Sequence, residues 1–247
     1  MYIRDKIIVI TGASSGLGKE TAINLSRHGG SIVLVARSAT RLKQVQDEIT
    51  EITGQPPVTV QCDITREEDI SSMVDTIRQK YDHIDILINN AGIAKYLVSE
   101  KISNQEMRQL FKVNFFGTYY CIKALLPLMK HKGQGYILNV SSLFGLVVPF
   151  ADISIYSASK FALVGFSEGL RKELKSYGIG VGLFMPGSIN TPFQNKKEEG
   201  ERKTPPFLIM DVSKAAKIIV NMITKNKKNV VTPRWMLPFF KTIALFS

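Results

Sequence analysis

The fold is decided by the stretch IIVITGASSGLG, residues 7–18, together with KETAINL, residues 19–25, which follows it. Residues 7–10 form an apolar, β-branched run of the kind found in buried strands, and residues 19–25 have helical character. Gly12, Gly16 and Gly18 stand between them. Glycines let the backbone turn tightly and approach a ligand, while the N-terminus of a helix offers free N–H groups and a positive dipole. The stretch therefore predicts a strand, an anion-binding loop and a helix in succession.

Outward from this stretch, the chain alternates between apolar strand-like runs and helical stretches. The runs are residues 7–10, 32–36, 58–61, 84–89, 136–140, 181–184 and 230–232. They are continuously apolar, as strands buried on both faces of a sheet must be. We therefore predict an α/β fold: a doubly wound (Rossmann) parallel seven-stranded sheet with helices on both faces, in a single domain of residues 1–247. Ligands of such folds bind along the edge where the carboxyl ends of the strands meet.

The composition is that of an ordinary globular protein. Hydrophobic residues make up 45% of the 247 residues and charged residues 21%, with no low-complexity tract. The first residues lack the apolar stretch of a secretory signal, and no apolar run approaches the roughly 20 residues of a membrane span. Cys62 and Cys121 have no His or Cys nearby at metal-ligand spacing, so we expect buried, reduced thiols and no metal. These features favour a cytoplasmic protein.

The chain is basic, with a formal net charge of +11. Residues 194–247 carry eleven Lys and Arg against four Asp and Glu, so most of the excess lies near the C-terminus. Such an excess attracts phosphates, nucleic acid or anionic lipid. Two interpretations of this basic excess stay open: it is ordinary solvated surface charge, or it forms a patch that binds a partner. The basic residues lack interleaved stacking aromatics and a recognition helix, which argues against a nucleic-acid partner.

Four motifs resemble those of the classical short-chain dehydrogenase/reductase family, and they occur in the family's order. They are TGxxxGxG at residues 11–18, NNAG at 89–92, YxxxK at 156–160 and PG at 186–187. The resemblance extends from residue 5 to about residue 192. It implies an oxidoreductase that interconverts a carbonyl (ketone, aldehyde or 3-oxoacyl) and an alcohol by hydride transfer, with a nicotinamide dinucleotide as cofactor and a small molecule as substrate.

The end of the second predicted strand indicates which cofactor is preferred. It reads Val35-Ala36-Arg37-Ser38 and contains no carboxylate, the group that binds the ribose hydroxyls of NAD. A guanidinium suits the extra phosphate of NADP, so we predict NADP(H), although Arg37 is also compatible with a plain surface position. Ser14, Ser15 and Ser38 would add hydroxyl donors to the same phosphate.

The family resemblance completes the predicted cofactor site. It implies that Asp63 and Ile64 border the adenine, that the NNAG backbone lines the ribose, and that Ile189 and Thr191 bind the nicotinamide. For Asp63, turn formation or capping of the following helix is an alternative explanation. The predicted cofactor-binding residues are Gly12, Ser14, Ser15, Gly16, Leu17, Gly18, Arg37, Ser38, Asp63, Ile64, Asn90, Ala91, Gly92, Tyr156, Lys160, Pro186, Gly187, Ile189 and Thr191.

Tyr156 and Lys160 lie four residues apart near the start of a helix that we predict to run to about residue 177, so both project from one face. Reduction of a carbonyl needs a proton for the developing alkoxide, and a phenol with a pKa of about 10 is a poor base for the reverse step. A neighbouring ammonium would stabilise the phenolate and make Tyr156 competent in both directions.

The resemblance implies two further catalytic residues. Ser142, followed by Gly145, matches the serine that stabilises the substrate oxygen, and a long interval from Ser142 to Tyr156 leaves Ser141 as an alternative. Asn114 matches the asparagine that bends its helix and holds a water on the lysine side of a proton relay. The predicted catalytic residues are therefore Asn114, Ser142, Tyr156 and Lys160, with no metal required.

Residues 193–212 stand where the family carries a mobile substrate lid, and they combine the charged KKEEGERK with the apolar PPFLIM. An apolar pocket would suit a hydrophobic ketone, aldehyde or acyl chain, although core packing explains several of its candidate residues equally well. These candidates are Leu143, Phe144, Val147, Phe150, Phe193 and Phe207. A 3-oxoacyl reductase and a broad carbonyl or steroid-like reductase both stay open.

Residues 233–247 are rich in aromatic side chains and flanked by basic ones. They fit docking on the protein's own fold, a subunit contact or a weak contact with an anionic membrane surface, in that order of preference. The family resemblance implies a homodimer or homotetramer, paired through the helices that contain Asn114 and Tyr156. The alternative to an enzyme is an NADPH-binding sensor or scaffold with little turnover, for which we expect the loss of a catalytic group.

Overall fold

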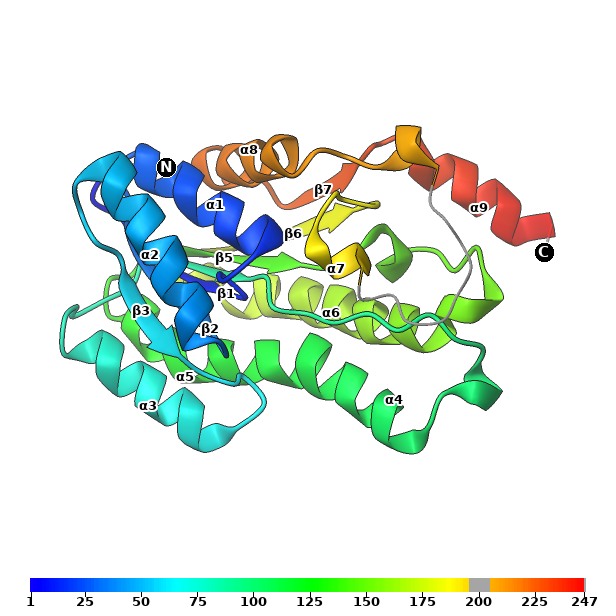
Figure 1. Cartoon of the computed structure of the whole chain (residues 1–247), viewed down its shortest axis with the longest axis horizontal. Helices are drawn as coiled ribbons and strands as arrows, with labels where there is room; N and C mark the ends of the chain where they lie inside the picture. Colours follow the sequence, from blue (N-terminus) through cyan, green and yellow to red (C-terminus); the bar gives the residue numbers. More distant parts are fainter. Residues whose placement is uncertain (196–204, 247) are drawn as a thin grey trace.

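The structure, a computed structural model, describes residues 1–195 and 205–246 (Figure 1). Its centre is a seven-stranded sheet in which every pairing is parallel, in the order β3-β2-β1-β4-β5-β6-β7. The strands are β1 (Ile7–Thr11), β2 (Ser31–Ala36), β3 (Val58–Gln61), β4 (Ile86–Asn89), β5 (Gly135–Val140), β6 (Ile179–Pro186) and β7 (Asn229–Thr232). The predicted doubly wound parallel sheet is thereby confirmed, although β4 begins at Ile86 rather than at residue 84.

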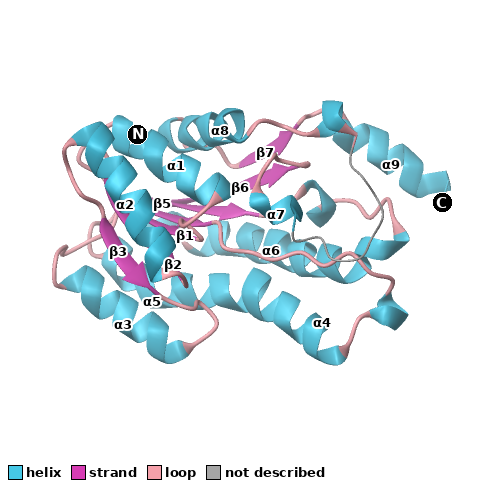
Figure 2. Cartoon of the chain, in the orientation of Figure 1, coloured by secondary structure: helices cyan, strands magenta, loops and turns pink. Residues whose placement is uncertain are grey.

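Helices cover both faces of the sheet (Figure 2). One face packs against α1 (Gly16–Arg27), α2 (Ala39–Thr53) and α8 (Val212–Thr224). The other packs against α3 (Glu67–Arg78), α5 (Thr118–Lys130) and α6 (Ser154–Glu173). The remaining helices are α4 (Asn104–Phe111), α7 (Pro192–Asn195) and α9 (Met236–Phe246). Helix α6 ends earlier than predicted because a 3-10 turn, Lys175–Tyr177, follows it and leads to a left-handed Gly178.

Strand β1 shows why the apolar runs are continuous. Its residues are all buried, and they alternate between two cores: Ile8 and Ile10 belong to the core with α1 and α8, and Val9 to the core with α3 and α5. β1 pairs with β2 on one side and with β4 on the other. From β1 the chain continues to β2 and β3 on one side of the sheet, and from β4 it continues to β5, β6 and β7 on the other side. The connections therefore diverge between β1 and β4, and a crevice opens at the carboxyl ends of these two strands.

A tyrosine from β5 crosses the neighbouring strand β6. Tyr136 is 1% exposed, and its hydroxyl donates a 2.6 Å hydrogen bond to the Lys227 carbonyl. The ring reaches this carbonyl over Gly182, where an added Cβ would lie only 1.9 Å from the Tyr136 hydroxyl oxygen. The absence of a side chain at residue 182 is therefore a requirement of the packing between β5, β6 and the segment that precedes β7.

Candidate active site

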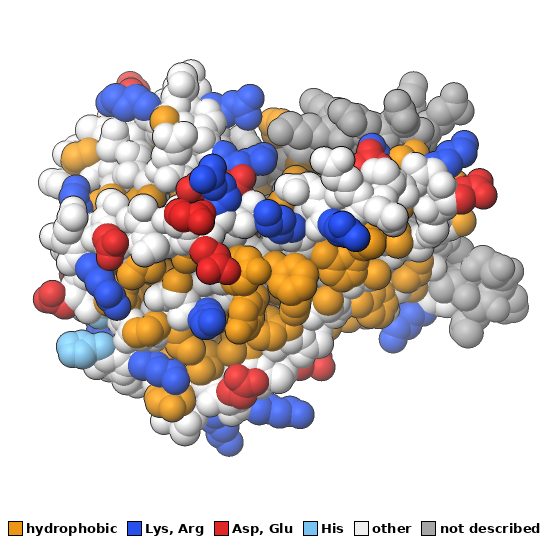
Figure 3. All heavy atoms as spheres, turned by 90° about the horizontal axis from the view of Figure 1, so that it is seen from below, with side chains coloured by type: hydrophobic (Ala, Val, Ile, Leu, Met, Phe, Trp, Pro, Cys, Tyr) orange, Lys and Arg blue, Asp and Glu red, His pale blue; other side chains and the backbone are white. Residues whose placement is uncertain are grey.

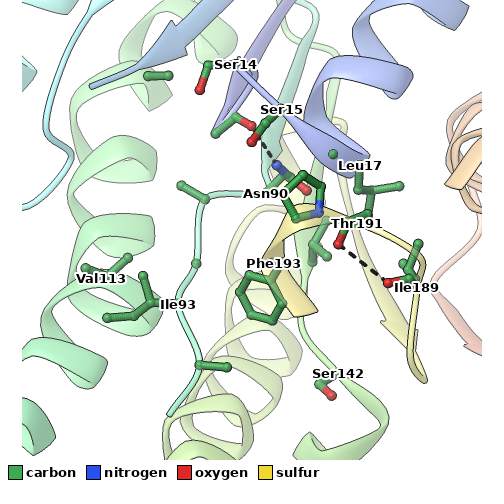
Figure 4. A pocket seen from close by; sticks show the side chains of 18 of the residues that line it. Ser14, Ser15, Leu17, Asn90, Ile93, Val113, Ser142, Ile189, Thr191 and Phe193 are labelled. Atoms are coloured by element: carbon green, nitrogen blue, oxygen red, sulfur yellow. Dashed lines mark hydrogen bonds between the residues drawn. The ribbon is translucent and has the colours of Figure 1, made fainter. Parts of the chain in front are cut away.

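A cavity of about 1020 Å³ opens at the carboxyl ends of the strands. Figure 4 shows Ser14 and Ser15 at one end of the view and Ser142 at the other, with Thr191 and Phe193 between them. The loops that follow β1, β2, β3, β4, β5 and β6 all contribute to its walls. Every predicted cofactor-binding residue except Gly18 lines it, so the motifs that are scattered along the chain meet in one space.

The glycine loop after β1 packs directly against the loop after β4. Gly12 has a φ of 67°, and a Cβ added to it would lie 2.9 Å from the Ala91 Cα. The Asn90 amide donates hydrogen bonds to the carbonyls of Thr11, at 3.1 Å, and Gly12, at 3.2 Å. Gly18 does not line the cavity, because it faces this contact: a Cβ there would lie 2.3 Å from the Gly12 carbonyl oxygen. The structure gives Gly18 a packing role in place of the predicted cofactor contact.

The N-terminus of α1 offers an anion-binding end. The helix begins at Gly16, no acidic side chain lies in its first turn, and the Ser15 side chain makes no capping hydrogen bond. The N–H groups of the first turn have no partner within the helix, so they are suited to phosphate oxygens. Ser14, Ser15, Gly16 and Leu17 all line the cavity.

Two arginines stand beside the carboxyl end of β2. Arg37 and Arg41 are both exposed and line the same cavity. Within residues 1–195 and 205–246, neither forms an ion pair with an acidic side chain. The Ser38 hydroxyl accepts a 3.3 Å hydrogen bond from the Arg41 N–H, so Ser38 caps α2. Arg41 was not among the residues predicted from the sequence, although its place four residues after Arg37, in the first turn of α2, was a signal that could have found it.

Asp63 forms a turn and also lines the cavity. Its Oδ1 accepts hydrogen bonds from the Thr65 N–H, at 2.9 Å, and the Thr65 hydroxyl, at 2.8 Å. Partial burial alone would raise the pKa of Asp63, but these hydrogen bonds and the charges of Arg37 and Lys112 lower it below its ordinary value. The turn explains the residue type, and its position leaves a contact with an adenine open. Helix α3 begins at Glu67, so Asp63 is not its N-cap.

Ser142, Tyr156 and Lys160 meet in the wall of the cavity and are all buried. The Ser142 hydroxyl forms a hydrogen bond with the Tyr156 hydroxyl. The Ser141 hydroxyl donates instead to the Lys160 carbonyl, at 3.1 Å, and so serves the packing of α6. Of the two serines that the sequence left as alternatives, Ser142 is the one that meets Tyr156.

Burial controls the ionisation of both groups on α6. It raises the pKa of Tyr156 to about 12, and the hydrogen bond with Ser142 offsets only part of this rise. Burial lowers the pKa of Lys160 to about 8. The Lys160 ammonium donates a 3.2 Å hydrogen bond to the Val140 carbonyl. The expected lowering of the Tyr156 pKa by Lys160 is therefore not observed, because the cost of desolvating the phenolate dominates.

Asn114 lies in a π-helical turn, Lys112–Gly117, which joins α4 to α5. Its Oδ1 accepts a 2.8 Å hydrogen bond from the Ile93 N–H, and its amide donates to the Ile93 carbonyl, at 2.9 Å, and to the Ser159 hydroxyl, at 3.0 Å. Asn114 is fully buried and does not line the cavity. Its side chain ties the irregular helix to the loop after β4 and to α6.

The apolar end of the cavity differs from the predicted one. Phe144 and Phe193 line it, together with Tyr96, which was not predicted from the sequence. Tyr96 lies in an irregular segment, where no periodicity shows which side chain turns inward. Leu143 and Val147 instead belong to a small buried core, against which Phe150 packs. The side chain of Phe207 lies outside the described part of the chain, as do residues 196–204 of the predicted lid.

Helix α9 docks on the protein's own fold, the first of the three alternatives for the C-terminal segment. Met236 and Phe240 are buried in the same small core as Leu143 and Val147. The Phe240 ring lies 6.1 Å from that of Phe144. Among the described residues, no helix has the length and apolar character needed to cross a membrane. Cys62 and Cys121 are buried and not bonded to each other.

Comparisons with known proteins agree with this geometry. A model of the short chain dehydrogenase family matches residues 6–202. An uncharacterized oxidoreductase of Staphylococcus saprophyticus is 35% identical over 81% of this chain and 81% of its own. A protein of Arabidopsis thaliana named 11-beta-hydroxysteroid dehydrogenase-like 2 is 31% identical over 95% of this chain and 75% of its own. A solved structure of a short-chain dehydrogenase from Sphingobium yanoikuyae in complex with NADPH has a TM-score of 0.85 at 27% identity, covering 98% of this chain and 94% of that one.

Proposed function

Because the chain belongs to the short-chain dehydrogenase/reductase family, we propose that it is an NADP(H)-dependent oxidoreductase that interconverts a carbonyl and an alcohol by hydride transfer. One observation carries the proposal. A single cavity joins a glycine loop at the N-terminus of α1, two arginines after β2 and the buried group of Ser142, Tyr156 and Lys160. This arrangement combines an anion-binding end with a proton-donating end.

The residues present fit NADP(H). The first turn of α1, without acidic side chains, would hold the pyrophosphate, and Arg37 with Arg41 would hold the extra phosphate on the ribose. Asn90, Ala91 and Gly92 would line the ribose, while Ile189 and Thr191 would meet the nicotinamide. The NADPH in the Sphingobium yanoikuyae relative supports this choice of cofactor.

The chain's own residues would handle the substrate oxygen and its proton. When bound, the cofactor supplies the hydride that the carbonyl carbon accepts. The Ser142 hydroxyl would donate a hydrogen bond to the carbonyl oxygen and stabilise the negative charge that develops there. With a pKa of about 12, the Tyr156 phenol stays protonated at neutral pH and can give its proton to the oxygen. Ser142 and Tyr156 together polarise the carbonyl.

Lys160 would resupply this proton, and Asn114 would hold the surrounding structure in place. The pKa of Lys160 is about 8, so its ammonium can release and regain a proton near neutral pH. Asn114 fixes the loop at Ile93 and contacts Ser159 in the turn of α6 that joins Tyr156 to Lys160. In this proposal, the irregular helix at Asn114 holds a water on the Lys160 side of the proton relay.

The substrate in this proposal is a small carbonyl compound or alcohol with an apolar body. Phe144, Phe193 and Tyr96 give the end of the cavity an aromatic lining. The name of the Arabidopsis thaliana relative supports a steroid-like substrate, and a 3-oxoacyl chain is compatible with the same lining. Residues 193–212 would close over this end as a lid.

The protein would form a homodimer or homotetramer in the cytoplasm. Figure 3 shows hydrophobic side chains in a continuous band across the lower face of the molecule. Phe116, Tyr119 and Phe161, from the π-helical turn, α5 and α6, are each at least 37% exposed. A continuous hydrophobic band and exposed aromatic side chains of this kind are suited to being covered by a second copy of the chain.

The test is NADPH oxidation, followed by absorbance, with a panel of ketones, aldehydes and 3-oxoacyl thioesters. We expect turnover with at least one apolar carbonyl and a preference for NADPH over NADH. Tight NADPH binding without reduction of any carbonyl would favour a sensor or scaffold instead. A preference for NADH would contradict the role given to Arg37 and Arg41.

A further inference from the structure

A second, smaller pocket lies outside the proposed active site, between α8 and the edge strand β7. It has a volume of about 330 Å³, and its walls include three basic side chains, Lys217, Lys227 and Arg234. Within the part of the chain that the structure describes, none of the three pairs with an acidic side chain. Asp211 is the one acidic residue among residues 205–246, and its carboxylate caps α8. The pocket is therefore an unbalanced cationic site.

An exposed pair of aromatic side chains adjoins this pocket. Trp235 follows Arg234 directly in the chain, and Trp235 and Phe239 are each 50% exposed. Their rings lie 6.1 Å apart and form one ridge. Met236 and Phe240, on the other side of α9, are buried against the fold. The exposed aromatic ridge therefore lies directly beside the basic Arg234, which is itself exposed and lines the pocket.

We propose that this surface binds an anionic phospholipid bilayer, with lipid phosphates in the cationic pocket and the Trp235–Phe239 ridge in the interface. The cationic pocket needs anionic groups, and the aromatic ridge beside it needs an apolar layer. The surface of an anionic bilayer offers both next to each other. Tryptophan also favours the membrane–water interface because its ring is apolar and its N–H remains hydrogen-bonded. The net charge of +11 attracts the whole chain to such a surface.

The location of the ridge links the membrane surface to the apolar end of the cavity. Figure 1 shows α9 extending outward at the right-hand end of the molecule, where the C-terminus lies. The buried side of α9 contacts the ring of Phe144, which lines the cavity, and an added Cβ on Gly187 would lie 3.1 Å from the Met236 sulfur. A docked molecule would hold this end near the lipid. The binding surface itself uses no proposed catalytic or cofactor-binding residue.

Trp235 makes the proposal directly measurable, because it is the single tryptophan of the chain. The full-length protein is titrated with vesicles of phosphatidylcholine alone and of phosphatidylcholine mixed with phosphatidylglycerol. We expect a blue shift of the Trp235 emission and quenching by brominated lipid with the mixed vesicles only. High salt should reverse the binding, since it screens the attraction between the basic side chains and the lipid.

Two variants separate the charged and aromatic parts of the surface. The triple change Lys217→Gln, Lys227→Gln and Arg234→Gln should weaken partitioning roughly 100-fold, about fivefold for each basic residue. Its control is the triple change Arg78→Gln, Lys80→Gln and Lys101→Gln, which alters the net charge equally at exposed positions elsewhere.

Phe239→Ser tests the aromatic part of the surface and should weaken partitioning about tenfold. Its control is Ile52→Ser, an exposed apolar residue on α2.

Several outcomes would overturn the proposal. One is equal binding of neutral and mixed vesicles, and another is an equal loss in the matched control variants. A blue-shifted emission without vesicles that depends on protein concentration would mean that a second copy covers the ridge. NADPH binding is measured in the same samples, so a misfolded variant is recognised, and failure here leaves the proposed oxidoreductase activity untouched.

Discussion

The ring of Tyr96 meets the ring of Tyr156 edge to face, with centroids 5.5 Å apart and planes at 63°. Tyr96 comes from the irregular segment after β4, and Tyr156 from the first turns of α6. Burial raises the pKa of Tyr96 above its ordinary value, so its phenol remains neutral and does not act as a base. Tyr96 therefore acts as a wall that fixes the ring from which the proposed proton transfer starts.

Replacing Tyr96 by alanine should reduce kcat/KM about fivefold, because an aromatic pair is worth about 1 kcal/mol beyond its burial and its loss frees the Tyr156 ring. Tyr96→Phe keeps the edge-to-face contact and should retain most of the activity. Steady-state kinetics gives kcat/KM for both variants, and NADPH affinity is the control for folding. Equal losses in the two variants would show that the hydroxyl matters more than the ring contact.

Tyr156→Phe should leave NADPH binding within a few-fold of the parent protein and lower kcat by roughly 100- to 10,000-fold, the usual contribution of a positioned acid. The substitution removes one hydroxyl and keeps the ring that packs against Tyr96. Fluorescence titration with NADPH and single-turnover reduction measure the two effects separately. Retention of full turnover would remove Tyr156 from the mechanism.

The rate of carbonyl reduction should fall as the pH rises through about 8, the pKa of Lys160. Below this pH the ammonium is present and can resupply the proton; above it, the ammonium is lost, so the rate falls. Tyr156 remains protonated up to about pH 12 and does not limit the reaction in this range. The measurement is kcat against pH at saturating NADPH. Lys160→Arg stays protonated across this range and cannot release its proton, so kcat should be lower at every pH and the fall near pH 8 should disappear.

Arg37→Ala should raise the KM for NADPH roughly 10- to 100-fold, the equivalent of one hydrogen bond to a charged group, and leave the KM for NADH nearly unchanged. Arg41→Ala should act in the same direction, because Arg41 lines the same cavity, and the backbone N–H that caps α2 is kept in this variant. The comparison of the two cofactors is the control. A parallel rise in both KM values would mean that the arginines act on the fold of the loop and not on the phosphate.

The sequence predicted the sheet and most residues of the cavity, because buried parallel strands are continuously apolar and the glycine loop, NNAG and YxxxK occur at fixed places relative to them. It did not predict Arg41 or Tyr96. The direction of the Arg41 side chain depends on where α2 begins, and Tyr96 lies in an irregular segment without a periodic pattern. It also left Leu143 and Val147 open between the pocket and the core, and the structure places them in the core. Residue type alone does not separate an apolar wall from an apolar core.

The last prediction concerns the packing of Tyr136 over β6. Gly182→Ala should lower the free energy of unfolding by about 2 kcal/mol, the range typical of an overpacked core, because the new methyl group overlaps the Tyr136 hydroxyl. Gly165→Ala is the matched control: nothing lies within 4 Å of its added Cβ in α6, and replacing a helical glycine should raise stability by about 0.5–1 kcal/mol.

In the background of Tyr136→Phe, which removes the hydroxyl that lies 1.9 Å from the added Cβ, Gly182→Ala should cost clearly less stability. Chemical denaturation of the four variants measures this coupling. Additive effects at residues 136 and 182 would show that the backbone of β6, and not the tyrosine hydroxyl, resists the extra methyl group.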